Sequence, residues 1–126
     1  MDRIEVSTRD GRLSFRPGEA IEGTVSWRLD EAPGSVELRL FWYTEGKGDR
    51  DLEIVTTVPF EAPGAEDRRA FRLEAPAEPW SFSGKLISLT WALEAVAEPG
   101  SKAGRTEIVV SPSESEILLH PAVPGA

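Results

Sequence analysis

The sequence predicts an all-β protein, an immunoglobulin-like antiparallel β-sandwich of about seven or eight strands. The first reason is that apolar and polar residues alternate with a period of two through most of the chain. The second is that short Pro-Gly and Gly-rich stretches, suited to reversing the chain, separate the alternating runs at fairly even intervals. No segment shows a convincing amphipathic helical pattern.

The first half of the chain supplies the clearest strand, from Ala20 to Leu29. One face of that strand is apolar and presents Ile21, Gly23, Val25, Trp27 and Leu29. The run from Ser35 to Glu45 alternates in the same way, with Val36, Leu38, Leu40 and Trp42 facing inward and Glu37, Arg39, Phe41 and Tyr43 facing outward. Before these strands, Ile4–Thr8 and Arg12–Phe15 flank Asp10-Gly11, a dipeptide that predicts a hairpin between them.

The second half of the chain predicts four more strands. Residues 52–58 and 70–74 alternate, and residues 86–97 form the strongest apolar run, which predicts a central strand. Residues 106–111 supply a late strand. Between the strands at 70–74 and 86–97, residues 75–84 carry two prolines and no alternation. We therefore expect a long loop there that crosses between the sheets.

The length and composition of the chain limit the number of domains it can form and the kinds of partner it can bind. The 126 residues suit one domain, which we place at residues 1–112. We expect 113–126 to be a C-terminal tail, in which Ile117-Leu118-Leu119 could add one short edge strand before disordered chain. The formal charge of −8 argues against nucleic acid as a partner. No apolar run approaches the length of a membrane helix, so we expect no membrane insertion.

The absence of cysteine excludes disulfides and thiolate chemistry, and we expect no cofactor and no metal. The first residues lack the apolar stretch of a secretory signal, so a cytoplasmic location is expected.

Two segments together resemble the arrestin family. The segment from Phe15 to Val25 is similar to the pattern aromatic-x-Pro-Gly-Glu-x-hydrophobic-x-Gly-x-Val of the arrestin N-terminal domain. The segment from Pro79 to Ala95 is similar to the Pro-x-Ser-Phe-x-Gly stretch and the long strand that follows it in those proteins. The resemblance extends over residues 4–111, which corresponds to one arrestin-like domain of a single-domain bacterial type. It implies a scaffold or adaptor that binds proteins and is not an enzyme. The phosphate-sensing core of receptor-binding arrestins has no match here and is not carried over.

Three aromatic residues are candidates for partner binding. Phe41 and Tyr43 are neighbours on the outward face of one strand, and exposed aromatic pairs often mark interfaces, although a loop or the tail could equally cover them. Trp80 lies in the crossing loop, where it either caps the sandwich or remains accessible. The other tryptophans belong to inward-facing sets and are expected in the core; they are Trp27, Trp42 and Trp91.

Two other candidate sites have simpler explanations. Asp49, Asp51 and Glu53 could present carboxylates to calcium, but a hairpin with solvated charges explains them as well, and nothing fixes their separation for glycosidase chemistry. His120 is the single histidine and lies between leucine and proline near the end of the chain, without an obvious group to orient it as a catalytic base.

The sequence therefore favours a non-catalytic protein-interaction module whose partner is another protein or a second copy of the chain, bound through a sheet edge or the Phe41/Tyr43 surface. The alternative is a carbohydrate-binding sandwich that stacks sugars on Trp80 or Tyr43. A hydrolase would need convergent catalytic groups that these residues do not supply.

Overall fold

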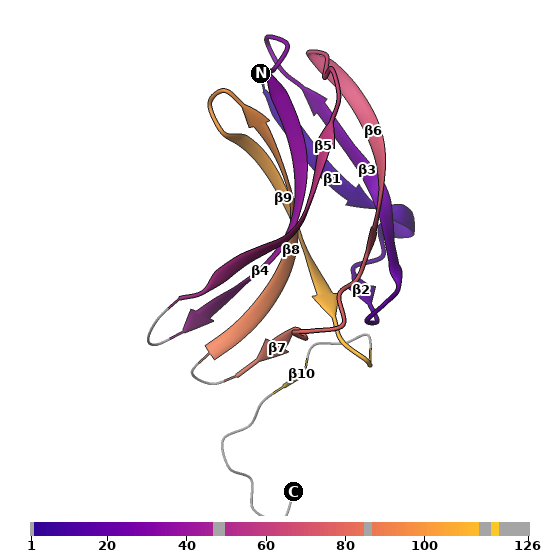
Figure 1. Cartoon of the computed structure of the whole chain (residues 1–126), viewed down its shortest axis with the longest axis vertical. Helices are drawn as coiled ribbons and strands as arrows, with labels where there is room; N and C mark the ends of the chain where they lie inside the picture. The colour runs from indigo at the N-terminus through magenta and orange to yellow at the C-terminus, as the bar shows by residue number, and fades with distance from the viewer. Residues whose placement is uncertain (1, 47–49, 85–86, 114–116, 119–126) are drawn as a thin grey trace, which may run out of the picture.

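The structure is a computed structural model that describes residues 2–46, 50–84, 87–113 and 117–118. Its smaller sheet contains three antiparallel strands in the order β1 (Arg3–Thr8), β3 (Ala20–Arg28) and β6 (Glu66–Glu74). It lies on the right in Figure 1, facing the larger sheet. In the described part of the chain, no helix has the length and apolarity needed to cross a bilayer.

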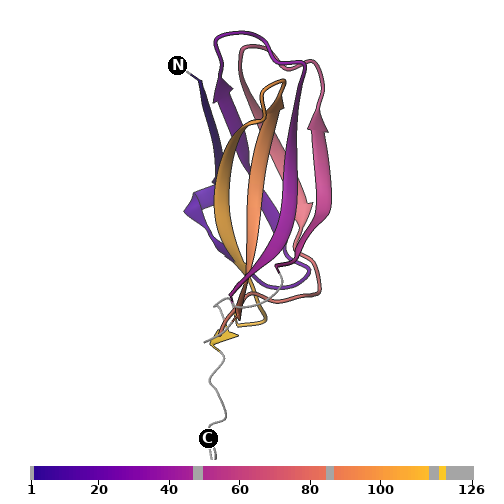
Figure 2. The ribbon, with the colours of Figure 1, turned by 90° about the vertical axis from the view of Figure 1, so that its left-hand side faces the viewer.

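The larger sheet contains seven strands. Along its main path the order is β10 (Ile117–Leu118), β7 (Phe82–Ser83), β8 (Ile87–Glu98), β4 (Ser35–Gly46) and β5 (Leu52–Phe60). β9 (Lys102–Val110) also pairs with β8, and β2 (Ser14–Phe15) pairs with β9. Figure 2 shows β9, β8, β4 and β5 side by side in front of the smaller sheet. The two sheets pack face to face, which confirms the predicted sandwich and the central place of β8.

The core lies between the facing sheets and consists of the inward residues of both. Trp91, Leu38 and Leu40 are fully buried, and Trp27 is only 3% exposed. Trp42 is half-buried and packs against the same cluster. Trp27 also contacts Phe60 of β5, with ring centroids 6.0 Å apart, so an aromatic pair bridges the two sheets.

The predicted hairpin around Asp10-Gly11 is wrong. Both residues have positive φ, 57° and 68°, as a tight turn requires, but they lie in a short 3-10 turn, η1 (Arg9–Gly11), that carries the chain from one sheet to the other. β1 pairs with β3, whereas β2 runs parallel to the end of β9. Burial explains the outcome, because the pairing of β2 with β9 places Phe15 in the core, where it is 2% exposed.

One side of the sandwich is closed by a seam between β1 and β9. The Thr106 hydroxyl donates a hydrogen bond of 2.6 Å to the carbonyl oxygen of Val6, and Lys102 forms an ion pair with Asp2 just before β1. A Cβ added to Gly104 would lie 2.2 Å from the carbonyl oxygen of Ile4. The backbones therefore approach too closely for any side chain at that position.

Gly23 supports a similar close approach within the smaller sheet. A Cβ at this position would lie 2.1 Å from the carbonyl oxygen of Ser7 and 2.7 Å from the ring of Phe71. Gly23 is therefore a position where neighbouring backbone and ring atoms approach the main chain closely.

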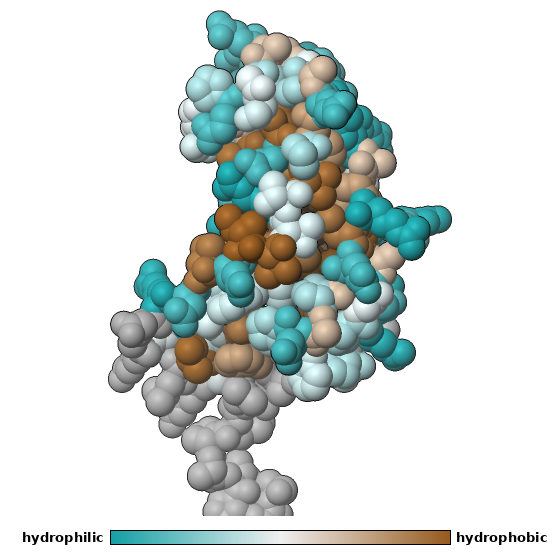
Figure 3. Space-filling model, viewed as in Figure 1, coloured by the Kyte–Doolittle hydropathy of each residue, from teal (hydrophilic) through white to brown (hydrophobic). Residues whose placement is uncertain are grey.

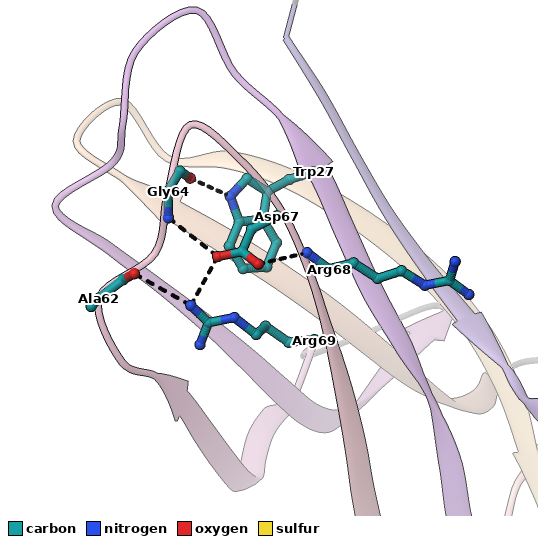
Figure 4. A network of polar contacts seen from close by, with 6 residues as sticks. All are labelled: Trp27, Ala62, Gly64, Asp67, Arg68 and Arg69. Atoms are coloured by element: carbon teal, nitrogen blue, oxygen red, sulfur yellow. Dashed lines mark hydrogen bonds and ion pairs between the residues drawn. The ribbon is translucent and has the colours of Figure 1, made fainter.

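The opposite side of the sandwich has β5 at the edge of one sheet and β6 at the edge of the other. A polar network fixes the turn between these strands (Figure 4). The Asp67 carboxylate accepts hydrogen bonds from the backbone N–H groups of Gly64 and Arg68, at 3.3 and 2.8 Å, and forms a 2.8 Å ion pair with Arg69. The Trp27 indole N–H donates to the Gly64 carbonyl oxygen at 2.8 Å. The contacts of the Asp67 carboxylate with Arg69, and then with the N–H groups of Arg68 and Gly64, lower the pKa of Asp67 to about 2.

Candidate functional site

The strongest candidate surface is formed by the first part of β5. This strand pairs with β4 on one side, and among the described residues no strand pairs with its other side. Leu52, Ile54 and Val55 are 62%, 47% and 44% exposed. They account for three of the six large hydrophobic residues exposed in the described part of the chain, and they lie within four consecutive positions. We call these three residues the β5 patch, and Figure 3 shows hydrophobic surface along this strand.

A β-bulge explains why these aliphatic residues are exposed. Leu40 pairs with Thr56, but the next residue of β4, Phe41, pairs with Ile54, so Val55 is an extra residue without a partner in β4. Directly paired residues point to the same face of a sheet. Thr56 therefore points inward with Leu40, whereas Ile54 points outward with Phe41. The bulge thus inverts the alternation of the strand, so that Leu52 and Ile54 point outward before it and Thr56 and Val58 point inward after it.

Phe41 lies beside this patch but is not an exposed aromatic, because it is only 3% exposed. Among the described residues, its cover includes a side chain from β9. The guanidinium of Arg105, on β9, lies 5.0 Å from the centroid of the Phe41 ring and 5.6 Å from that of Tyr43. Arg105 reaches these rings across β8, where the residue paired with Phe41 is the small, fully buried Ala92.

Tyr43 is half-buried and held in place by its neighbours. Its ring stacks on Phe41 with centroids 6.0 Å apart, and its hydroxyl donates a 2.9 Å hydrogen bond to the Glu107 carboxylate. Burial and this hydrogen bond raise the pKa of Tyr43 above its ordinary value. Tyr43 also helps to line a shallow pocket of about 230 Å³, together with Leu52 and Arg50. Tyr43 is therefore a rigid support for the β5 patch rather than a freely exposed ring.

Trp80 occupies a different place in the larger sheet. It precedes β7, which pairs with the side of β8 opposite to β4. Its side chain is 43% exposed, and its indole N–H donates to the Ala77 carbonyl oxygen at 2.8 Å. The neighbouring Ser81 is buried and hydrogen-bonded to Val110, so it is Ser81 that ties this loop to the sandwich. The structure does not bring Trp80 together with Phe41 and Tyr43 in any described contact.

The residues considered for metal binding are only partly described. Asp49 and His120 lie outside the described residues. The Asp51 backbone N–H donates to the Thr44 hydroxyl, and Glu53 accepts a 3.2 Å hydrogen bond from the Trp42 indole. Within the described ranges, no three His, Cys, Asp or Glu residues are grouped so that they could hold a metal ion.

The important residues that sequence reasoning missed are Arg105 and the β5 patch. The alternating pattern predicts a strand that includes Leu52 and Ile54. The bulge that turns these two residues outward cannot be recognised in that pattern. A usable signal was present in the composition, because Leu52, Ile54, Val55 and Val58 make β5 richer in aliphatic residues than an edge strand needs to be.

Comparisons with known proteins identify the fold. No protein-family model matches the chain, and no curated protein sequence matches it either. Among solved structures, the chain is similar to Spo0M, a sporulation control protein from Bacillus subtilis, with a TM-score of 0.62 and 18% sequence identity. The match covers 87% of this chain and 49% of the Spo0M chain, so this chain spans about half the length of that protein. At this identity the likeness shows the fold alone, which is a β-sandwich like that of Spo0M.

Proposed function

We propose that this chain is a non-catalytic protein-interaction module, a scaffold or adaptor that binds its partner through the β5 patch. The observation that carries the proposal is the exposure of Leu52, Ile54 and Val55 on a strand that is paired on one side only. Neighbouring apolar side chains of this size on a sheet edge are a feature of surfaces that another protein covers.

The residues around the β5 patch are held in fixed positions, which favours binding of a partner with a complementary shape. Phe41 and Tyr43 form a fixed floor under Arg105, and Arg105 is itself held by an ion pair of 3.2 Å with Glu94. The Tyr43 hydroxyl is engaged by Glu107. Such a preorganised floor lowers the entropic cost of binding, because these side chains are already ordered before a partner arrives. The same contacts disfavour the carbohydrate alternative at Tyr43, because its ring is already stacked on Phe41 and lies close to Arg105.

Site-specific crosslinking in whole cells tests this function. A photoreactive phenylalanine analogue at position 55 would sit beside Leu52 and Ile54, and the same analogue at position 13 provides a matched control, because Leu13 is 48% exposed elsewhere on the chain. We expect light to give a discrete protein adduct from position 55 and none of the same mass from position 13.

Substitution of the patch makes the test specific. Leu52→Ser combined with Ile54→Thr should remove the adduct, while Leu13→Ser should leave it unchanged. Both variants should remain folded, because the replaced side chains are largely exposed and lie outside the core. An adduct that survives the double substitution would sink the proposal, and an adduct of twice the mass of the chain would identify the partner as a second copy.

A further inference from the structure

The free edge of β5 has a defined usable length. Pro59 has no backbone N–H, and proline occurs within sheets where the missing N–H would point away from the neighbouring strand. Thr57 lies two residues earlier on the same side of the bulge, so its N–H faces away from β4, as an N–H at position 59 would. Pro59 therefore limits the row of outward donors to Leu52–Thr57, a stretch of about 20 Å at strand spacing.

Apolar side chains accompany this free edge. Leu52 and Ile54 point to the outer face, where they lie opposite Tyr43 and Phe41 of β4, and Val55 projects from the bulge. A strand placed beside β5 would set alternate side chains next to Leu52 and Ile54 on the same outer face. Those side chains would need to be aliphatic to bury this surface.

The charges at the beginning of β5 favour a partner that carries positive charge. Glu45, Asp51 and Glu53 lie around the first part of the strand, where the described basic residues are Arg50 and Arg105. Arg105 is already paired with Glu94. Lys47 and Asp49 have opposite charges and leave this balance unchanged. No described residue forms an ion pair with the carboxylates of Glu45 or Asp51. A partner with Lys or Arg beside this end of β5 would complement the excess negative charge.

From these observations we propose that β5 receives an extended segment of a partner protein as an additional strand along Leu52–Thr57. The segment would have aliphatic residues at alternate positions and a basic residue beside Asp51. The backbone of the segment supplies hydrogen bonds to the free edge, and its alternate side chains cover the β5 patch. The inference rests on the proposed function and specifies how the patch is used.

The same charges argue against a second copy as the occupant. Two β5 strands related by a two-fold axis would bring two equally acidic chains together, each with a charge of −8, and would place their Glu53 and Asp51 carboxylates along one shared edge. The bulge at Val55 would also be duplicated at the junction, where it disturbs regular pairing. A basic segment from another protein avoids the charge repulsion and meets one bulge rather than two.

A synthetic peptide tests the inference directly. The probe is a nine-residue peptide of alternating valine and threonine with lysine at both ends and neutral termini. The matched control has glutamate in place of both lysines. In an NMR titration of the isotope-labelled chain, the lysine peptide should shift the amide signals of 52–57 and slow the hydrogen exchange of the outward-facing amide of Thr57. The amides of β6, the other free edge, should not respond. At low salt the lysine peptide should bind about tenfold more tightly than the glutamate peptide.

Two variants separate backbone pairing from side-chain contact. Thr57→Pro removes one outward N–H while leaving the pairing with β4 intact, as Pro59 already does, and should weaken binding about fivefold. Leu13→Ser should have no effect. Signal shifts without exchange protection, or equal binding by the Thr57→Pro variant, would overturn strand addition. If the peptide fails while the double substitution still removes the crosslinked partner, strand addition is wrong and the protein-binding function stands. If the adduct also survives that substitution, both proposals are wrong.

Discussion

The seam between β1 and β9 predicts that Gly104→Ala destabilises the fold. The added Cβ would lie 2.2 Å from the carbonyl oxygen and 2.8 Å from the carbonyl carbon of Ile4, far inside van der Waals contact. These neighbours are backbone atoms of a strand paired with β3, so they cannot move aside without disturbing the smaller sheet. Overpacking of this kind costs about 1–3 kcal/mol.

A smaller effect opposes this cost. Alanine reduces the conformational entropy of the unfolded chain, which favours folding by about 0.4–1 kcal/mol at compatible positions. The expected net loss in the free energy of unfolding is therefore about 1–2 kcal/mol. With a urea dependence of about 2 kcal/mol per molar, the unfolding midpoint should fall by roughly 0.5–1 M.

Urea unfolding followed by tryptophan fluorescence measures this change, and Gly34→Ala is the matched control. A Cβ at Gly34 would meet its nearest neighbour, the carbonyl oxygen of Glu98, at an ordinary 3.5 Å. The Gly34→Ala midpoint should be unchanged or slightly higher. If Gly104→Ala had the same midpoint as Gly34→Ala, the two sheets would not be joined as closely at this seam as the structure indicates.

Two further predictions concern single side chains. Arg105→Ala should uncover Phe41 and lower the free energy of unfolding by about 1 kcal/mol. Arg105→Met keeps an apolar stem over the ring, so its free energy of unfolding should fall by less. Equal urea midpoints for the wild type and Arg105→Ala would contradict the covering role of Arg105. Asp67→Asn should be less stable than the wild type at neutral pH. Because the folded-state pKa of about 2 lies below the ordinary value of 3.8, the contribution of ionised Asp67 is present above about pH 4 and disappears as the pH falls towards 2. Thermal unfolding from pH 7 to 2 should show the two curves converging, and a constant difference would refute the assignment.

Local pattern was enough to predict the strands, because a half-buried strand needs alternation and this chain alternates clearly. The inward faces of β3 and β4 and the central place of β8 follow from the sequence. The pairing of β1 and β2 does not. The turn at Asp10-Gly11 has the positive φ angles of a tight turn, yet each flanking strand pairs with a partner elsewhere in the chain. Turn chemistry determines where a chain bends, whereas burial determines which strands pair.

The candidate surface was less predictable than the fold for a related reason. The bulge adds one residue, Val55, and so changes which face Leu52 and Ile54 occupy without changing the sequence pattern. The burial of Phe41 depends on Arg105, which is 64 positions away in the sequence and reaches it across another strand. Trp80 and Tyr43 lie outside the core cluster, and only the structure shows how far each is exposed.

The seam also has a consequence for how the protein is made. Its hydrogen bond joins Thr106 to Val6, 100 residues earlier, and β2 finds its partner only at Val109 and Val110. A ribosome must therefore release nearly the whole chain before the first strands can complete their contacts. Until then Val6 and Phe15, both buried in the finished sandwich, lack part of their cover. Proteins dominated by such distant contacts fold slowly and expose apolar surface in the meantime. The segment that contains Val6 and Phe15 is thus expected to expose apolar surface until β9 has paired.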